Sequence, residues 1–227
     1  MRNYNKVIDI KKSLKYYNFA KFLAKIVIKL CFRIKIEGKE NLNFDESFLI
    51  LSNHNSYLDP IIIGCIIDKF IAFMAKEELF KVPILNEFLH HVGSFSVKRG
   101  KGDKSYLENS INALKNGWSL NIFPEGSRSI TGKFQNVKYG AAKILLNNPI
   151  AFLPIALINT HIAMGKNKPI KLFTKITVKI GTPVYPQEYM PDENLTEEEK
   201  LEYIGKIYYS KIYELLPDEQ KNLEIIN

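Results

Sequence analysis

SFLILSNHNSYLDPIIIGCIIDKF, residues 47–70, has the pattern of a buried strand, a polar loop and a helix in direct succession. The run at 47–52 is almost wholly apolar, as expected of a strand that is buried on both faces. Asp59 followed by Pro60 resembles a helix N-cap with proline at the first helical position. The stretch therefore predicts a strand-to-helix unit, with Asn53–Asp59 as the loop between the two elements.

The same alternation of short apolar runs and longer helical patterns continues along the chain. Further strands are predicted at 70–75, 93–97, 119–123, 150–157 and 176–180. Helices are predicted between them, at 103–116 and 137–147. This alternation is typical of α/β architecture, so we expect a mixed, largely parallel central sheet covered by helices. Sites on such sheets gather at the carboxyl ends of the strands.

The chain divides at one modest boundary, near residue 40, where the polar segment GKEN separates a leader from the body. The body contains no internal repeat or flexible linker. It ends in an amphipathic segment that begins at Thr196 with a helix capping box. We therefore predict a helical leader of residues 1–40 and one α/β domain of residues 41–227.

The formal charge of +8 is concentrated in the leader. Residues 1–36 hold ten lysines and arginines against Asp9 alone, so the rest of the chain is close to neutral. A protein that binds nucleic acid carries its positive charge along a groove or face of the folded body. The distribution therefore argues against nucleic acid as a partner and favours an anionic membrane surface.

Apolar residues of the leader recur at helical spacing and form one stripe, made of Phe19, Phe22, Leu23, Ile26, Val27 and Leu30. Lys21, Lys25 and Lys29 form the opposite stripe. A transmembrane position would bury these lysines at about 2.5 to 3.5 kcal/mol each, so we expect a peripheral or monotopic helix with lysines at anionic headgroups. The alternative is that the apolar stripe packs on the protein's own body.

No metal site is predicted. Cys31 and Cys65 have neither zinc-binding spacing nor the pattern of a disulfide framework, and the adjacent His90 and His91 cannot both face one metal from a helix. The cysteine content fits a reducing compartment. Together with the basic leader, it predicts the cytoplasmic face of the cell membrane as the location.

The loop after the first strand contains a candidate catalytic pair, His54 and Asp59. A loop that turns into the first turn of a helix can bring the carboxylate onto the imidazole. A carboxylate on one ring nitrogen makes the other nitrogen a better base for a hydroxyl proton. The alternative from spacing alone is that Asp59 only caps the helix and His54 is only a polar loop residue.

A second polar loop, FPEGSRS at 123–129, follows the predicted strand at 119–123. Gly126 permits close approach of a backbone, and polar contacts are offered by Glu125, Ser127, Arg128 and Ser129. These are the groups of an anion-binding loop, although the loop is neither a Walker nor a Rossmann motif. The alternative is a surface loop with an ion pair between Glu125 and Arg128.

Arg99 lies just after the predicted strand at 93–97 and would reach the same edge of the sheet. A second guanidinium at that edge would complete a phosphate clamp, because its planar fork matches phosphate oxygens. The alternative is a solvated loop charge.

Taken in order, these segments resemble four sequence blocks of the glycerolipid acyltransferase family, which includes the 1-acylglycerol-3-phosphate acyltransferases. NHNSYLD, beginning at Asn53, is similar to the NHx4D block. GSFSVKR resembles a block that ends in an arginine, here Arg99. FPEGSRS resembles an E-G-[ST]-R-S block, with Ser127 where threonine is often found, and FLPIAL resembles a block centred on a proline, here Pro154. The resemblance covers roughly residues 35–185.

The resemblance implies that His54 is a general base, that Asp59 orients it, and that an acceptor phosphate is bound by Arg99, Glu125, Gly126 and Arg128. The acceptor hydroxyl would attack a thioester, acyl-CoA or acyl carrier protein, without a covalent enzyme intermediate or a bound cofactor. Members of the family also carry an N-terminal membrane-engaging helical element.

The expected acceptor is lysophosphatidic acid, which would give phosphatidic acid in phospholipid biosynthesis. Glycerol 3-phosphate, lyso-ornithine lipid and lysophospholipids stay open as acceptors. A non-catalytic peripheral lipid-binding protein is an alternative of another class, although a pure binder has no need for a base.

Overall fold

The computed structural model describes residues 10–43, 45–97 and 105–222, with side chains from Lys15 onward. In these residues seven strands form one sheet, in the order β1-β7-β6-β2-β5-β3-β4. The strands are β1 (Arg33–Glu37), β2 (Leu49–Ser52), β3 (Ile71–Lys76), β4 (Ser94–Val97), β5 (Ser119–Ile122), β6 (Phe152–Ile158) and β7 (Lys175–Ile180). Every neighbouring pair is parallel except β6 and β7. The predicted α/β class with a mixed, largely parallel sheet is confirmed.

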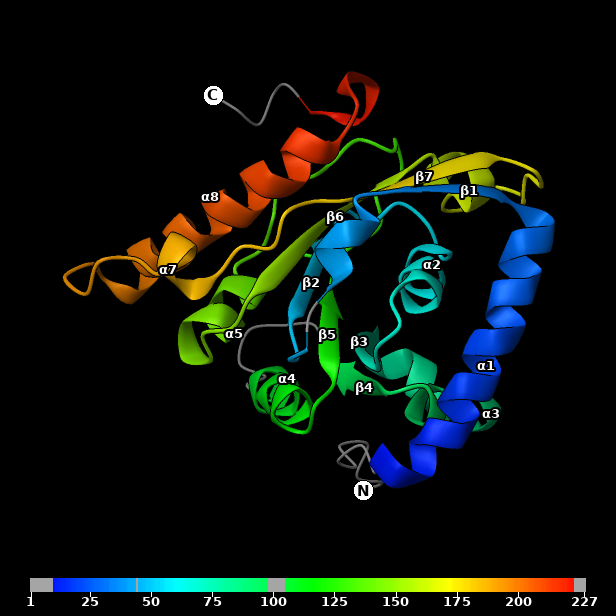
Figure 1. Ribbon diagram of the computed structural model, residues 1–227, viewed down its shortest axis with the longest axis horizontal. Helices are drawn as coiled ribbons and strands as arrows, with labels where there is room; N and C mark the ends of the chain where they lie inside the picture. The colour runs from blue at the N-terminus through cyan, green and yellow to red at the C-terminus, as the bar shows by residue number, and fades with distance from the viewer. Residues whose placement is uncertain (1–9, 44, 98–104, 223–227) are drawn as a thin grey trace.

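Helices cover both faces of the sheet (Figure 1). On one side lie α1 (Ile10–Cys31), α2 (Asp59–Ile66) and α3 (Pro83–His91), and on the other α4 (Ser105–Lys115), α5 (Gly140–Asn147) and α8 (Glu197–Leu215). The connections contain α6 (Thr160–Met164), α7 (Pro186–Tyr189), η1 (Lys39–Leu42), η2 (Glu77–Lys81) and η3 (Asp218–Gln220).

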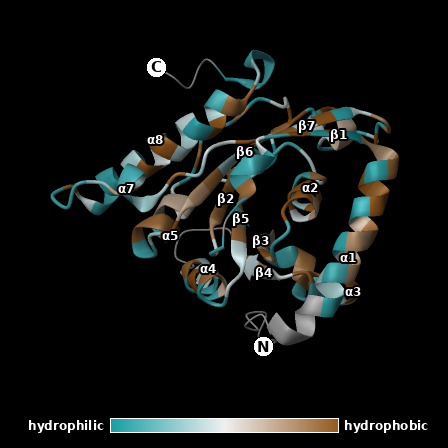
Figure 2. Ribbon diagram, in the orientation of Figure 1, coloured by the Kyte–Doolittle hydropathy of each residue, from teal (hydrophilic) through white to brown (hydrophobic). Residues whose placement is uncertain are grey.

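The sheet separates two hydrophobic clusters, and β2 contributes to both. Leu49 and Leu51 pack in the cluster beneath α4, α5 and α8, whereas Phe48 and Ile50 pack in the cluster beneath α1 and α2. All four side chains are fully buried. Figure 2 shows apolar colouring along β2 and β6. The nearly continuous apolar run of this strand is therefore explained by its two covered faces.

The edges of the fold differ most from the prediction. Residues 33–37, which fall in the predicted leader, form β1 and pair with β7 in the same sheet as the rest of the chain. The helix α3 was predicted only by its end, at His90 and His91, where the structure places it. At the chain's end the capping box is confirmed, because the hydroxyl of Thr196 accepts the Glu199 backbone N–H at 3.3 Å.

The helix α1 packs on the body through a face different from the predicted apolar stripe. Tyr17 and Ile28 are its buried contacts, with Ala20 and Ala24 between them on the same side. The stripe faces outward, with exposed fractions from 42% at Ile26 to 70% at Leu30.

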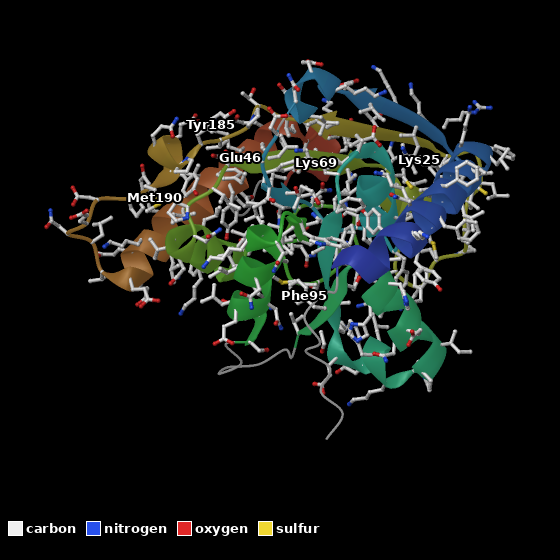
Figure 3. All side chains as sticks on the ribbon, turned by 60° about the horizontal axis from the view of Figure 1, so that its bottom comes forward. Lys25, Glu46, Lys69, Phe95, Tyr185 and Met190 are labelled. Atoms are coloured by element: carbon white, nitrogen blue, oxygen red, sulfur yellow. The ribbon has the colours of Figure 1, made fainter. Side chains whose placement is uncertain are left out.

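Two of the predicted headgroup lysines are held by the body instead. Lys25, labelled in Figure 3, lies with its ammonium 3.0 Å from the carboxylate of Asp68. Lys21 donates to the carbonyl of Ile67 and lies 3.4 Å from the same carboxylate. Its side chain is only 13% exposed. Within the described residues no helix is both long and apolar enough to cross a membrane.

Candidate active site

The two polar loops lie together because β2 and β5 are adjacent parallel strands. Parallel neighbours end at the same edge of a sheet, so the loop after β2 and the loop after β5 start side by side. They are joined through one residue. The backbone N–H of His54 donates to the carboxylate of Glu125, and its carbonyl accepts the N–H of Ser129 at 2.8 Å.

His54 and Asp59 form a direct hydrogen bond, with 2.8 Å between the histidine Nδ1 and the aspartate Oδ2. Asp59 is fully buried, and its Oδ2 also accepts the backbone N–H groups of Asn55 and Ser56, each at 2.6 Å. The carboxylate thus holds the loop instead of capping α2, whose N-cap is Leu58.

A stacking contact fixes the orientation of the histidine ring, in addition to the hydrogen bond with Asp59. It stacks on Phe123 with 4.0 Å between ring centroids and 15° between planes. With Nδ1 donating to a carboxylate, Nε2 carries the free lone pair. His54 also lines a cavity of about 520 Å³. The arrangement can therefore take a proton from a hydroxyl bound in that cavity.

Asn53 positions this loop against the neighbouring strand. Its side-chain amide donates to the carbonyl of Leu157 at 2.9 Å and accepts the N–H of the same residue at 2.7 Å. Pro154 also stabilises the sheet, since it is buried in β6 opposite Leu51, and its carbonyl accepts the N–H of Gly181. Neither side chain lines the cavity.

Glu125 differs from its predicted role as a phosphate ligand. It is 3% exposed, and both of its carboxylate oxygens are used by donors from His54 and from the backbone and side chain of Gln135. Glu125 also does not line the cavity, so its side chain does not reach a phosphate bound there. We therefore correct the prediction: Glu125 ties the two site loops together.

Burial raises the pKa of Glu125 to about 8, against the effect of the N–H donors of His54 and Gln135, which favour the charged form. Between pH 4.5 and 8, the folded protein retains a proton on Glu125 that the unfolded chain releases. The contribution to stability is therefore fully present below pH 4.5 and is lost as the pH rises to about 8.

We expect Glu125→Gln to remove this pH dependence, because an amide does not titrate. The free energy of unfolding of the wild type, minus that of the variant, should fall with rising pH by up to about 1.4 kcal/mol per unit and level off above pH 8. Urea unfolding across this range measures it. If the difference in the free energy of unfolding did not change with pH, Glu125 would be charged in the folded protein across this whole pH range.

Gly126 provides the turn that directs the next residues toward the cavity. Its φ is +69°, in the left-handed region that disfavours other residues. Ser127 and Arg128 follow and line the cavity. Ser129 is buried, and its hydroxyl accepts the N–H of Gly132 at 3.1 Å, so it stabilises the loop.

Arg128 is held against an aromatic ring that the sequence did not single out. Its guanidinium carbon lies 3.4 Å from the ring centroid of Tyr57, the fifth residue of NHNSYLD. Its Nη1 is buried and has no hydrogen-bond partner among the described residues. A guanidinium stacked on a ring keeps its N–H edge free for an anion. Arg99, the other arginine predicted to bind the phosphate, lies outside the described residues.

The rest of the cavity is mainly apolar. Its walls come from α1, α2, β3 and α3, and include Ala24, Ile61, Phe73 and Phe88. Lys166, from the connection after α6, lines it together with Tyr57 and Arg128. No group of three or more histidine, cysteine or acidic residues suited to a metal occurs in the part of the chain that the structure describes.

The fold and site define a class of protein: an α/β protein in which an aspartate-backed histidine and an arginine line one largely apolar cavity, as group transfer to a lipid requires. A family model described as Acyltransferase matches residues 33–158, and the chain belongs to this family.

Named relatives agree with that assignment. The chain is 30% identical over 202 residues to a 1-acyl-sn-glycerol-3-phosphate acyltransferase of Bacillus subtilis. The aligned residues make up 88% of this chain and 96% of the relative. A protein of the same name from Helicobacter pylori is 31% identical over 162 residues, 69% of this chain and 68% of that one.

The structure is also similar to the crystal structure of the 1-acyl-sn-glycerophosphate (LPA) acyltransferase, PlsC, from Thermotoga maritima. The TM-score is 0.72 at 28% sequence identity, over 95% of this chain and 83% of the other.

Proposed function

We propose that this enzyme transfers an acyl chain from a thioester to the free hydroxyl of lysophosphatidic acid, which gives phosphatidic acid. The observation that carries the proposal is the His54–Asp59 pair, 2.8 Å apart, in one cavity with Arg128. A base, a guanidinium whose Nη1 has no hydrogen-bond partner among the described residues, and apolar walls match the hydroxyl, the phosphate and the acyl chains of the reactants. The names of the relatives support the same reaction.

In the proposed mechanism His54 Nε2 takes the proton of the acceptor hydroxyl as its oxygen attacks the thioester carbonyl. The buried Asp59 stabilises the imidazolium that forms. The tetrahedral intermediate collapses to the ester, and the departing thiolate of coenzyme A or of acyl carrier protein recovers the proton from His54. No cofactor takes part beyond this thioester co-substrate.

A lipid-product assay tests the proposal. Purified enzyme is given lysophosphatidic acid, glycerol 3-phosphate, lyso-ornithine lipid or lysophosphatidylethanolamine, each with acyl-CoA and with acyl carrier protein thioester. Phosphatidic acid formed from lysophosphatidic acid at the highest kcat/KM is the expected result. A higher kcat/KM for another acceptor would overturn the choice of substrate, and no product with any pair would favour a lipid-binding role.

In the same proposal Tyr57 positions Arg128 for the acceptor phosphate. Replacing Tyr57 by Leu removes the ring, and cation–π contacts are worth about 0.5 to 2 kcal/mol. We expect the KM for the acceptor to rise roughly 2- to 30-fold, while kcat and the KM for the thioester change little. Steady-state kinetics with each substrate varied measures both constants.

Tyr57→Phe is the matched control, because it keeps the ring face and loses only the hydroxyl. It should behave like the wild type. If Tyr57→Phe were as impaired as Tyr57→Leu, or if only kcat fell in Tyr57→Leu, the stacking would not be the means by which Tyr57 acts.

We also propose that the outward face of α1 docks the enzyme on the cytoplasmic surface of an anionic membrane, as a peripheral or monotopic protein. The support is the row of outward-facing apolar side chains, which include Phe19 and Phe22, at 63% and 61% exposed. Large contiguous apolar surfaces mark interaction sites. The basic residues of the leader supply attraction to anionic lipid, apart from Lys21 and Lys25, which pair with Asp68.

A further inference from the structure

We infer that Lys166 is a second cationic ligand of the acceptor phosphate, and that together with Arg128 it selects a phosphomonoester headgroup. This inference rests on the proposed acyl transfer to lysophosphatidic acid and extends it to the choice between acceptors.

The backbone fixes Lys166 beside the site, although the residue is far from both loops in the sequence. Gly165, which precedes it, forms an antiparallel bridge with Ser56 of the NHNSYLD loop. The hydroxyl of Ser56 donates to the carbonyl of Met164 at 2.6 Å. These contacts hold the connection after α6 against the loop that carries His54 and Tyr57.

The bend at this point is tight. A Cβ atom on Gly165 would lie 2.5 Å from the carbonyl oxygen of His161, so a larger residue would displace the backbone. The carbonyl of Gly165 also accepts the N–H of Lys168 at 3.1 Å, which closes a turn around Lys166. The position of the Lys166 backbone is thus determined by its neighbours, and its side chain is left to bind a ligand.

The charges around the cavity favour an anion at this place. Lys166 lines the cavity with His54, Tyr57 and Arg128, and no aspartate or glutamate of the described residues lines it. Lys21 and Lys76 are further cations of the lining, and Lys21 is already bonded to Ile67 and Asp68. Neither the Arg128 Nη1 nor the Lys166 ammonium has an ion-pair partner within the described ranges.

Two cations on one headgroup discriminate between phosphate esters by charge. A phosphomonoester carries about −1.5 to −2 at pH 7, because its second pKa is near 6. A phosphodiester carries a single negative charge and has fewer free oxygens. Arg128 presents a planar fork from one loop and Lys166 a compact charge from another, so the more highly charged monoester gains more from the pair.

The test compares Lys166→Ala with Lys166→Arg and with the control Lys168→Ala. Lys168 belongs to the same exposed turn but does not line the cavity. For each variant kcat/KM is measured in detergent micelles with lysophosphatidic acid, a phosphomonoester, and with lysophosphatidylethanolamine, a phosphodiester. Thermal unfolding of each variant reports whether the fold is intact.

We expect Lys166→Ala to raise the KM for lysophosphatidic acid about 10-fold, since charge-assisted hydrogen bonds are among the strong ones. Its preference for the monoester over the diester should fall by a similar factor. Lys166→Arg should retain most of the preference, and Lys168→Ala should match the wild type for both acceptors.

Two results would overturn the inference while the proposed function stands. One is that Lys166→Ala prefers the monoester over the diester as strongly as the wild type does. The other is that its kcat/KM falls equally for both acceptors, which would indicate a structural effect on the turn. If the wild type itself formed no phosphatidic acid from lysophosphatidic acid, the proposed function would fail and this inference with it.

Discussion

Replacing His54 by Ala is expected to lower the rate of acyl transfer by about 10²-fold or more, because a positioned general base contributes about 10² to 10⁴. The base depends on the ring orientation, which the Asp59 hydrogen bond and the Phe123 stack fix together. Turnover of the purified variant with saturating thioester and acceptor measures the loss. The KM for the acceptor should change much less, since His54 acts on the hydroxyl and not on the phosphate.

Two further variants separate chemistry from folding. His54→Asn keeps a donor near the position of Nδ1 for Asp59 but has no group at the position of Nε2, so it should be as inactive as His54→Ala. His91→Ala is the matched control, because His91 lies on α3, contacts Glu87 and does not line the cavity. Near-native turnover in a folded His54→Ala enzyme would exclude His54 as the base.

Changing Phe19, Phe22 and Leu30 together to Gln should reduce binding to anionic vesicles by on the order of 10²-fold or more. Full burial of such side chains is worth about 1.5 to 3 kcal/mol each. All three are more than 60% exposed on α1, so the fold should not depend on them. Sedimentation with vesicles measures binding, and activity on acceptor in detergent micelles checks that the catalytic site is intact.

The matched control places the same change on the opposite side of the molecule. Tyr185, Met190 and Tyr203 are 45%, 38% and 44% exposed, and Figure 3 labels the first two at the far end from α1. Their replacement by Gln should leave vesicle binding unchanged. Equal binding by the α1 variant and the wild type would assign the membrane contact to another surface. Deletion of the leader is a poorer test, because it would also remove the buried Tyr17 and Ile28.

Much of the candidate site could be predicted because its first pair is local in sequence. His54 and Asp59 belong to one loop, and a single turn into α2 brings them together. Arg128 could be placed near them because adjacent parallel strands end at the same edge. Glu125 could not be assigned in the same way. Its role depends on backbone donors at His54 and Gln135, which only the folded chain brings to it.

Tyr57 and Lys166 carried no signal strong enough to find them. An aromatic residue in a loop and a lysine in an exposed turn are common, and neither has a distinctive spacing to the rest of the motif. Their importance arises from contacts between distant segments: the stack of Tyr57 on Arg128, and the bridge between Ser56 and Gly165.

The sequence by itself determined the α/β class and the strand-to-helix unit at 47–70, because hydrophobic periodicity is a local property. Only the tertiary structure decided that β1 joins the sheet beside β7, and which face of α1 packs on the body. Either the apolar stripe or the face with Tyr17 and Ile28 could be the side of α1 that packs on the body. The choice depends on the partners that the fold offers, here the hydroxyl contact of Tyr17 with Ile71 and the pairing of Lys21 and Lys25 with Asp68.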